Sequence, residues 1–226
     1  MCGISGVVGL NNISEALFQG IRNLEYRGYD SCGIALIKKN NLVVRKNTGG
    51  VDEFFRKNDI LSTKSTIGIA HTRWATHGSV TRENSHPLMS CDESFAVVHN
   101  GIISNYRLLR EDLIGEGHKF YSETDTEVIP HLLEKYYKKH KNVETAFLST
   151  LNILEGTFAV VLISSYHPDQ IFCARRESPL MIGIGDEQKF VGSDFNAFID
   201  YTKNAIIIED GEYAIISRDS YVVKSF

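Results

Sequence analysis

The apolar residues of this chain predict strands at both ends and helices between them. Residues 4–10 ("ISGVVGL") and 158–163 ("FAVVLI") are short apolar runs of strand length. Three stretches between them instead carry apolar residues at helical spacing, namely 105–117, 124–140 and 143–156. Because strands and helices are segregated along the chain, the pattern predicts the α+β class with antiparallel sheets rather than alternating βαβ units.

Two helix boundaries can be predicted from single residues. An apolar stripe predicts a helix over residues 14–28, with Ser14 as its cap and Gly28 at its end. Pro130 fits the predicted helix over 124–140 only near its first turn, so that helix is expected to begin close to this residue.

The strands of the last third suggest how the sheets are covered. Several, such as 157–163, are apolar on both faces, which indicates two sheets packed together with helices outside. Hairpins are predicted around Asn40–Asn41 and, within the segment 205–217, at Asp210–Gly211.

Length, charge and cysteine content disfavour several classes of protein for this chain. The length of 226 residues without a Pro/Gly/Ser-rich linker predicts one domain over 1–226. A net charge of -4 gives no reason to expect nucleic acid, and no apolar run reaches the roughly 18–20 residues of a membrane span. The four cysteines lack CxxC or Cys/His ligand spacing, which argues against a metal site or disulfides and favours the cytoplasm. No cofactor is expected.

Cys2 is the first candidate for chemistry. Removal of Met1 would leave a thiol and a free α-amine on one residue. A thiol with a pKa of about 8.5 needs a base, and an α-amine with a pKa of about 7.7–8.0 could accept its proton. From these residues alone, Cys2 is either the start of a buried strand or half of a catalytic pair.

Four polar or Gly-bearing segments stand beside apolar ones: "YRGYDSCG" (26–33), "HTRWATHG" (71–78), "VVHNG" (97–101) and "SETDTE" (122–127). Taken singly, "HNG" is also a turn at a strand end and Arg73 a surface charge. Trp74 is also a side chain at the edge of the core, and Asp125 a helix cap. Taken in order, they resemble the class II glutamine amidotransferases, which are N-terminal nucleophile hydrolases. Among these, the chain is similar from Cys2 to about residue 220 to the glutaminase domains of the glucosamine-6-phosphate synthase family.

The resemblance implies a fold and a reaction. The expected fold is a four-layer αββα sandwich of two antiparallel sheets flanked by helices. The expected reaction is attack by Cys2 on the side-chain amide of L-glutamine, giving a γ-glutamyl thioester and ammonia. The side-chain amide of Asn100 and the backbone N–H of Gly101 would form the oxyanion hole.

The resemblance also assigns residues that bind the substrate. Arg73 would hold the α-carboxylate of glutamine and Asp125 its α-ammonium group. Trp74, Thr76 and His77 would line a loop that closes over glutamine.

Two further residues match family positions as supports: Arg27, which would help to organise the site, and His86, whose role stays open. His71 and His99 are expected to be structural, whereas the remaining histidines outside the motifs are expected to be exposed or incidental: His118, His131, His140 and His167.

In the family, sugar-isomerase domains that accept the ammonia follow the glutaminase domain, and no part of residues 1–226 is expected to belong to them. Any homodimer is expected to form through those domains. Two alternatives stay open from the sequence: a glutaminase domain that serves another acceptor, such as a purine precursor, and a non-catalytic glutamine-binding module.

Overall fold

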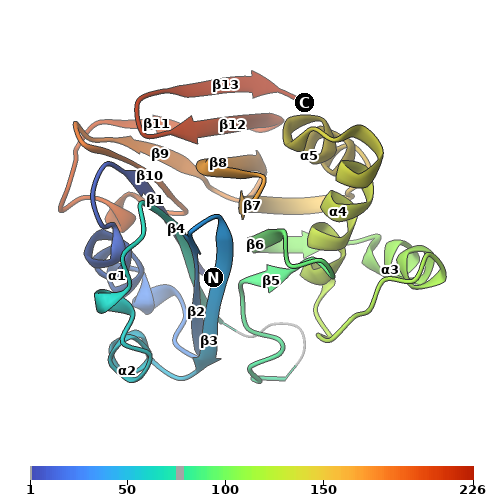
Figure 1. The fold of residues 1–226 in the computed structure, drawn as a ribbon, viewed down its shortest axis with the longest axis horizontal. Helices are drawn as coiled ribbons and strands as arrows, with labels where there is room; N and C mark the ends of the chain where they lie inside the picture. The colour runs from blue at the N-terminus through green and yellow to red at the C-terminus, as the bar shows by residue number, and fades with distance from the viewer. Residues whose placement is uncertain (1, 75–78) are drawn as a thin grey trace.

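Two antiparallel sheets packed face to face form the centre of the molecule in the computed structural model, which describes residues 2–74 and 79–226 (Figure 1). Within these residues the first sheet has the strand order β11-β9-β10-β1-β4-β2-β3 and the second β13-β12-β8-β7-β6-β5. The strands of the first sheet are β1 (Gly3–Gly9), β2 (Ser31–Lys38), β3 (Asn41–Thr48), β4 (Ile67–Arg73), β9 (Met181–Ile184), β10 (Gln188–Gly192) and β11 (Ala205–Ile207). Those of the second are β5 (Leu88–Met89), β6 (Phe95–Ile103), β7 (Gly156–Ser164), β8 (His167–Arg176), β12 (Glu212–Ser217) and β13 (Tyr221–Ser225).

Helices cover the outer face of each sheet. Figure 1 shows α1 and α2 on one side of the strands and α3, α4 and α5 on the other. The α-helices are α1 (Ser14–Asn23), α2 (Val51–Lys57), α3 (Tyr106–Gly115), α4 (Val128–His140) and α5 (Val143–Leu151). Short 3₁₀ turns are η1 (Glu25–Arg27), η2 (Ile60–Ser62), η3 (Asp125–Glu127) and η4 (Phe195–Ala197). The predicted α+β class and the four-layer αββα arrangement are therefore confirmed.

Three apolar clusters explain why so many strands are apolar on both faces. One cluster lies between the sheets and includes Ile69 of β4 and Val161 of β7. A second joins the outer face of the second sheet to α4 and α5, with Val160 pointing into it. The third joins the first sheet to α1 and α2. Adjacent residues such as Val160 and Val161 are both fully buried because successive side chains of a strand point to opposite faces.

One predicted hairpin is displaced and another is wrong. The first turn lies at Lys39–Asn40, since Lys38 pairs with Asn41. The segment around Asp210–Gly211 does not form a hairpin, because β11 pairs with β9 in the first sheet while β12 pairs with β8 and β13 in the second. Gly211, with a φ of +80°, lies where the chain crosses between the sheets. The Asp-Gly pair therefore predicted correctly that the chain turns here, but it did not predict which strand β12 pairs with.

The helix boundaries follow the predictions in part. Ser14 is the first residue of α1 rather than its cap, and its hydroxyl donates to the Thr63 carbonyl at 2.6 Å. Gly28 follows the 3₁₀ turn η1, not the α-helix, which ends at Asn23. Pro130 is the third residue of α4, so the predicted start of that helix is confirmed. Among the described residues, no helix is both long and apolar enough to cross a membrane.

Candidate active site

Cys2 lies at the start of β1, beside the end of β4. Gly3 pairs with Thr72 across the two strands, which brings Cys2 next to Arg73 and Trp74. The Trp74 backbone N–H donates to Cys2 Sγ at 3.2 Å. A Cβ at Gly3 would lie 2.7 Å from Thr72 Oγ1, so a residue with a side chain could not follow Cys2 at this register without displacing its neighbours.

The environment of Cys2 favours its neutral thiol. Burial raises the pKa of the Cys2 thiol, while the hydrogen bond from Trp74 and the positive charges of Arg73 and Arg27 lower it in part. The thiol is therefore protonated at neutral pH and needs a base to attack as a thiolate.

Asn100 links Cys2 to the second sheet. Its Nδ2 donates to the Cys2 carbonyl oxygen at 2.9 Å, and its Oδ1 lies 2.9 Å from His71 Nε2. An amide nitrogen carries two N–H donors, so one of them is not used in the bond to Cys2. The next residue, Gly101, has a φ of +125°, and a Cβ there would lie 2.0 Å from the Thr157 carbonyl oxygen. Only glycine fits this position of β6.

Three buried histidines lie close to Asn100: His71, His86 and His99. The rings of His71 and His86 have centroids 4.3 Å apart, and the His99 backbone N–H donates to His86 Nδ1 at 3.4 Å. His99 Nδ1 in turn lies 2.8 Å from Thr126 Oγ1. Burial lowers the pKa of His71 to about 3 and also lowers the pKa values of His86 and His99. All three are neutral near pH 7, so they act as fixed hydrogen-bonding groups.

Arg73 and Asp125 bring opposite charges to the same place. Arg73 ends β4, is 5% exposed, and donates through Nη1 to the Ser79 carbonyl at 3.1 Å. Asp125 begins η3, and its Oδ2 accepts the Ile103 backbone N–H at 2.7 Å. The side chain of Asp125 therefore anchors η3 to β6 and does not cap the turn that it begins.

Arg27 of η1 and Trp74, which follows β4, border the site on the side of the first sheet. Arg27 donates through Nε to the Cys2 carbonyl at 3.2 Å and pairs through Nη1 with Asp194 at 3.0 Å. Trp74 is 46% exposed and meets Tyr29 edge-on, with ring centroids 5.8 Å apart.

The sequence reasoning missed one contributor to this side of the site. A Cβ at Gly28 would lie 2.7 Å from the Trp74 backbone nitrogen, so only glycine lets the "YRGYD" segment pack here. The sequence contains this glycine within the motif, but Gly28 was interpreted as the end of the preceding helix.

Most of the predicted site residues line one small cavity of about 50 Å³. Its lining consists of Cys2, Arg73, Trp74, His86, His99, Asn100, Gly101, Thr124, Asp125 and Thr126. Arg27 contacts this set through the Cys2 carbonyl. Thr76 and His77, expected in the same site, lie outside the described residues. The cavity thus combines a thiol, an amide donor, a guanidinium and a carboxylate, which suits a small zwitterionic substrate.

Comparison with known proteins agrees with this chemistry. The family described as a glutamine amidotransferase domain matches residues 71–200. The glutamine–fructose-6-phosphate aminotransferase (isomerizing) of Thermococcus kodakarensis is 46% identical over 224 residues, which are 99% of this chain and 37% of that enzyme. The enzyme of the same name from Pyrococcus horikoshii is 44% identical over 99% of this chain and 38% of its own length. The chain therefore spans little more than a third of these relatives.

The solved structure of the glutamine phosphoribosylpyrophosphate amidotransferase from B. subtilis, complexed with ADP and GMP, is also similar. It superposes with a TM-score of 0.86 at 26% identity, over 99% of this chain and 49% of that one. A glutamine aminotransferase class-II domain protein from Silicibacter pomeroyi shares the fold with a TM-score of 0.69 at 13% identity.

Proposed function

This chain belongs to the glutamine amidotransferase family, and from that premise we propose that it hydrolyses L-glutamine to L-glutamate and ammonia with Cys2 as the nucleophile. The observation that carries the proposal is the cavity in which the Cys2 thiol, the Asn100 amide and the charges of Arg73 and Asp125 converge.

The α-amine of Cys2 serves as the base in this proposal, once Met1 has been removed. An α-amine with a pKa of about 7.7–8.0 can take the thiol proton near neutral pH. The histidines of the site are poor alternatives, because burial holds the pKa of His71 at about 3 and lowers those of His86 and His99.

The chemical steps follow from this pairing. The sulfur of Cys2 forms a bond to the amide carbon of the glutamine side chain as its proton moves to the α-amine. The oxyanion that develops accepts hydrogen bonds from Asn100 Nδ2 and the Gly101 backbone N–H. The C–N bond then breaks as the α-amine returns the proton to the leaving nitrogen, which departs as ammonia. Water hydrolyses the thioester to glutamate and restores the thiol.

Substrate recognition rests on the paired charges of the cavity. The guanidinium of Arg73 binds the α-carboxylate of glutamine, and the carboxylate of Asp125 binds its α-ammonium group. Trp74 borders the substrate, while Arg27 and His86 hold the neighbouring groups in place.

Hydrolysis by the purified chain tests the proposal. Wild-type protein should release equal amounts of glutamate and ammonia, and hydroxylamine should intercept the thioester as γ-glutamyl hydroxamate. Cys2→Ala should lose both activities, whereas Cys32→Ala, which removes a buried thiol of β2, should keep them. Undiminished glutamate release by Cys2→Ala would contradict the assigned nucleophile, and glutamine binding by the wild type without turnover would indicate a binding module.

The mass of the intact protein tests the base. The active chain should lack Met1, so that its first residue is Cys2. Full activity in protein that retains Met1 would exclude the α-amine and require another base.

We further propose that residues 1–226 form one domain that supplies ammonia for the synthesis of glucosamine 6-phosphate from fructose 6-phosphate in the cytoplasm. The support is the name of the relatives that are 44–46% identical, against 26% for the phosphoribosylpyrophosphate enzyme. The accepting sugar-isomerase domain belongs to the longer enzyme. Incorporation of ¹⁵N from amide-labelled glutamine by the longer natural chain tests this, since a product other than the amino sugar would identify another acceptor.

A further inference from the structure

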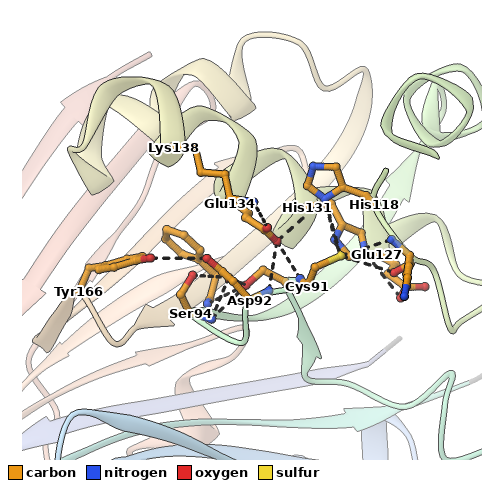
Figure 2. A network of polar contacts seen from close by, with 12 residues as sticks. Cys91, Asp92, Ser94, His118, Glu127, His131, Glu134, Lys138 and Tyr166 are labelled. Carbon is orange, nitrogen blue, oxygen red and sulfur yellow. Dashed lines mark hydrogen bonds and ion pairs between the residues drawn. The ribbon is translucent and has the colours of Figure 1, made fainter. Parts of the chain in front are cut away.

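A second cluster of chemically capable side chains lies outside the glutamine cavity. It consists of Cys91 in the turn between β5 and β6, His118 after α3, and His131 and Glu134 on α4 (Figure 2). In Figure 2 these side chains converge on one point from three separate segments. One ligand atom from each residue lies within 4.8 Å of the other three.

The distances within the cluster resemble the edges of a metal-centred tetrahedron. His118 Nδ1 lies 3.4 Å from His131 Nδ1, and Cys91 Sγ lies 3.5 Å from His131 Nδ1 and 3.8 Å from His118 Nδ1. Glu134 Oε2 lies 3.9 Å from His118 Nδ1. Tetrahedral zinc with Zn–N of about 2.0–2.1 Å and Zn–S of about 2.3 Å has N···N edges of about 3.4 Å and S···N edges of about 3.6 Å. Cys91, His118 and His131 therefore match three edges of such a tetrahedron, and Glu134 would move closer to complete it.

Neighbouring groups hold these side chains in orientations that suit ligands. His131 Nε2, on the far side of its ring, faces Glu127 Oε1 at 3.8 Å, which is longer than a hydrogen bond but on the side where a carboxylate supports a zinc-bound imidazole. The Lys119 backbone N–H donates to Cys91 Sγ at 3.3 Å. The Cys91 backbone N–H donates to Glu134 Oε2 at 2.8 Å.

The cluster's side chains on α4 and that of His118 are shielded from water, whereas Cys91 is open to it. The side chains of His131 and Glu134 are only 1% and 3% exposed, and that of His118 is 9% exposed. The two imidazole Nδ1 atoms face each other, and one N–H at most can lie between them. Cys91 is exposed and lines, with His131, a cavity of about 660 Å³ through which an ion could enter.

We propose that Cys91, His118, His131 and Glu134 bind a single Zn²⁺ ion. A set of one thiolate, two imidazoles and one carboxylate suits zinc better than the oxygen-preferring Mg²⁺ or Ca²⁺. The sequence predicts no such site because its ligands are far apart: Cys91 and Glu134 are 43 residues apart, and His118 lies 27 residues from Cys91.

The ion has a structural role in this proposal. It ties the turn before β6 and the loop after α3 to α4, which directly follows η3 and hence Asp125. Zinc would thereby stabilise the second sheet and its helices without touching glutamine. Because a metal that binds the folded state stabilises it, the melting temperature should rise with zinc concentration.

Metal content and cobalt spectra of the full chain test the site. Protein purified without chelators should contain one zinc per chain, and chelator-treated protein should bind Co²⁺ with a thiolate-to-cobalt charge-transfer band. Cys91→Ser should lose that band. Both Cys91→Ser and His118→Gln should weaken zinc binding at least about 10-fold, which is the loss already seen when a group that only supports a metal ligand is removed. His140→Gln, on an exposed residue of the same helix, should bind as the wild type does.

These readouts do not depend on glutamine turnover, so they are separate from the test of the proposed function. Folded wild-type protein that binds no zinc and gives no cobalt charge-transfer band would overturn the proposal. So would unchanged zinc affinity in folded Cys91→Ser and His118→Gln. If either variant fails to fold, the zinc content of the wild type alone decides.

Discussion

His71 and Asn100 meet across the two sheets, with His71 Nε2 2.9 Å from Asn100 Oδ1. His71 belongs to β4 of the first sheet and Asn100 to β6 of the second. Because Asn100 Nδ2 donates to the Cys2 carbonyl, its Oδ1 must accept, and His71 must carry its proton on Nε2. Burial keeps the imidazole neutral, with a pKa of about 3, so this tautomer persists at physiological pH. The pair fixes the direction of the amide beside the thiol.

Replacing His71 should therefore reduce turnover more than it weakens substrate binding. His71→Phe keeps a ring but removes the donor, and we expect kcat to fall roughly 10-fold with little change in KM. Asn100→Ala should cost more, about 10²–10³ in kcat, since it removes the oxyanion donor itself. Steady-state glutaminase kinetics measure both. A rise in KM at constant kcat for His71→Phe would refute this positioning role.

Asp125→Asn should separate the charge of this residue from its structural hydrogen bond. The amide oxygen can still accept the Ile103 N–H, so the melting temperature should hold. The loss of charge should raise KM for glutamine about 10–100-fold, corresponding to the roughly 1.5–3 kcal/mol of a charged hydrogen bond. Glu111→Gln, an exposed acid of α3, is the matched control and should leave KM unchanged. Equal KM values for the two variants would exclude Asp125 from substrate binding.

Gly101→Ala should damage both stability and activity. Its Cβ would lie 2.0 Å from the Thr157 carbonyl oxygen, and its φ of +125° disfavours any side chain. We expect a loss of at least about 1–3 kcal/mol in the free energy of unfolding. Gly115→Ala, where the new Cβ meets nothing within 4 Å, should be neutral or stabilise α3 by up to about 1 kcal/mol. Urea unfolding distinguishes them; equal stability would mean that β6 can relax around residue 101.

The buried histidines predict an early loss of stability in acid. The pKa of His71 falls to about 3 in the folded state and that of His86 also falls, whereas unfolded histidine has a pKa of about 6.5. Below pH 6.5 the unfolded chain binds protons that the native state does not, so the stability present above that pH is lost as the pH falls toward 3. Each histidine contributes a slope of up to about 1.4 kcal/mol per pH unit.

Urea midpoints measured between pH 7 and 4.5 check this slope. The variant His71→Phe should show a shallower dependence than the wild type, because one of the titrating groups is gone. Exposed His140 provides the control, since His140→Gln should keep the full slope. A pH dependence that is the same in all three proteins would mean that His71 does not contribute.

Local features of the chain accounted for much of the fold. Adjacent buried residues such as Val160 and Val161 indicated strands covered on both faces, and Pro130 located the start of α4. The motifs that resemble the amidotransferases indicated the αββα sandwich. These signals are readable because the alternation or spacing of apolar residues reports which faces of an element are buried.

Local features failed where the answer depended on a distant partner. Asp210–Gly211 has the composition of a hairpin turn, yet the strands on its two sides join different sheets. His118 and His131 were expected to be exposed or incidental, but their side chains are only 9% and 1% exposed and both contact Cys91. The spacing of nearby residues predicts neither the sheet that each strand joins nor the contact of the two histidines with Cys91.

The sequence by itself thus determined the class of fold, the family, and the residue types available for chemistry at Cys2, Asn100 and Asp125. Only the tertiary structure decided which of them meet: the contact of His71 with Asn100, and the convergence of Cys91 on α4. The physical reason is that periodicity encodes burial along one element. Contacts between elements depend on how the sheets pair and pack, which the whole chain settles together.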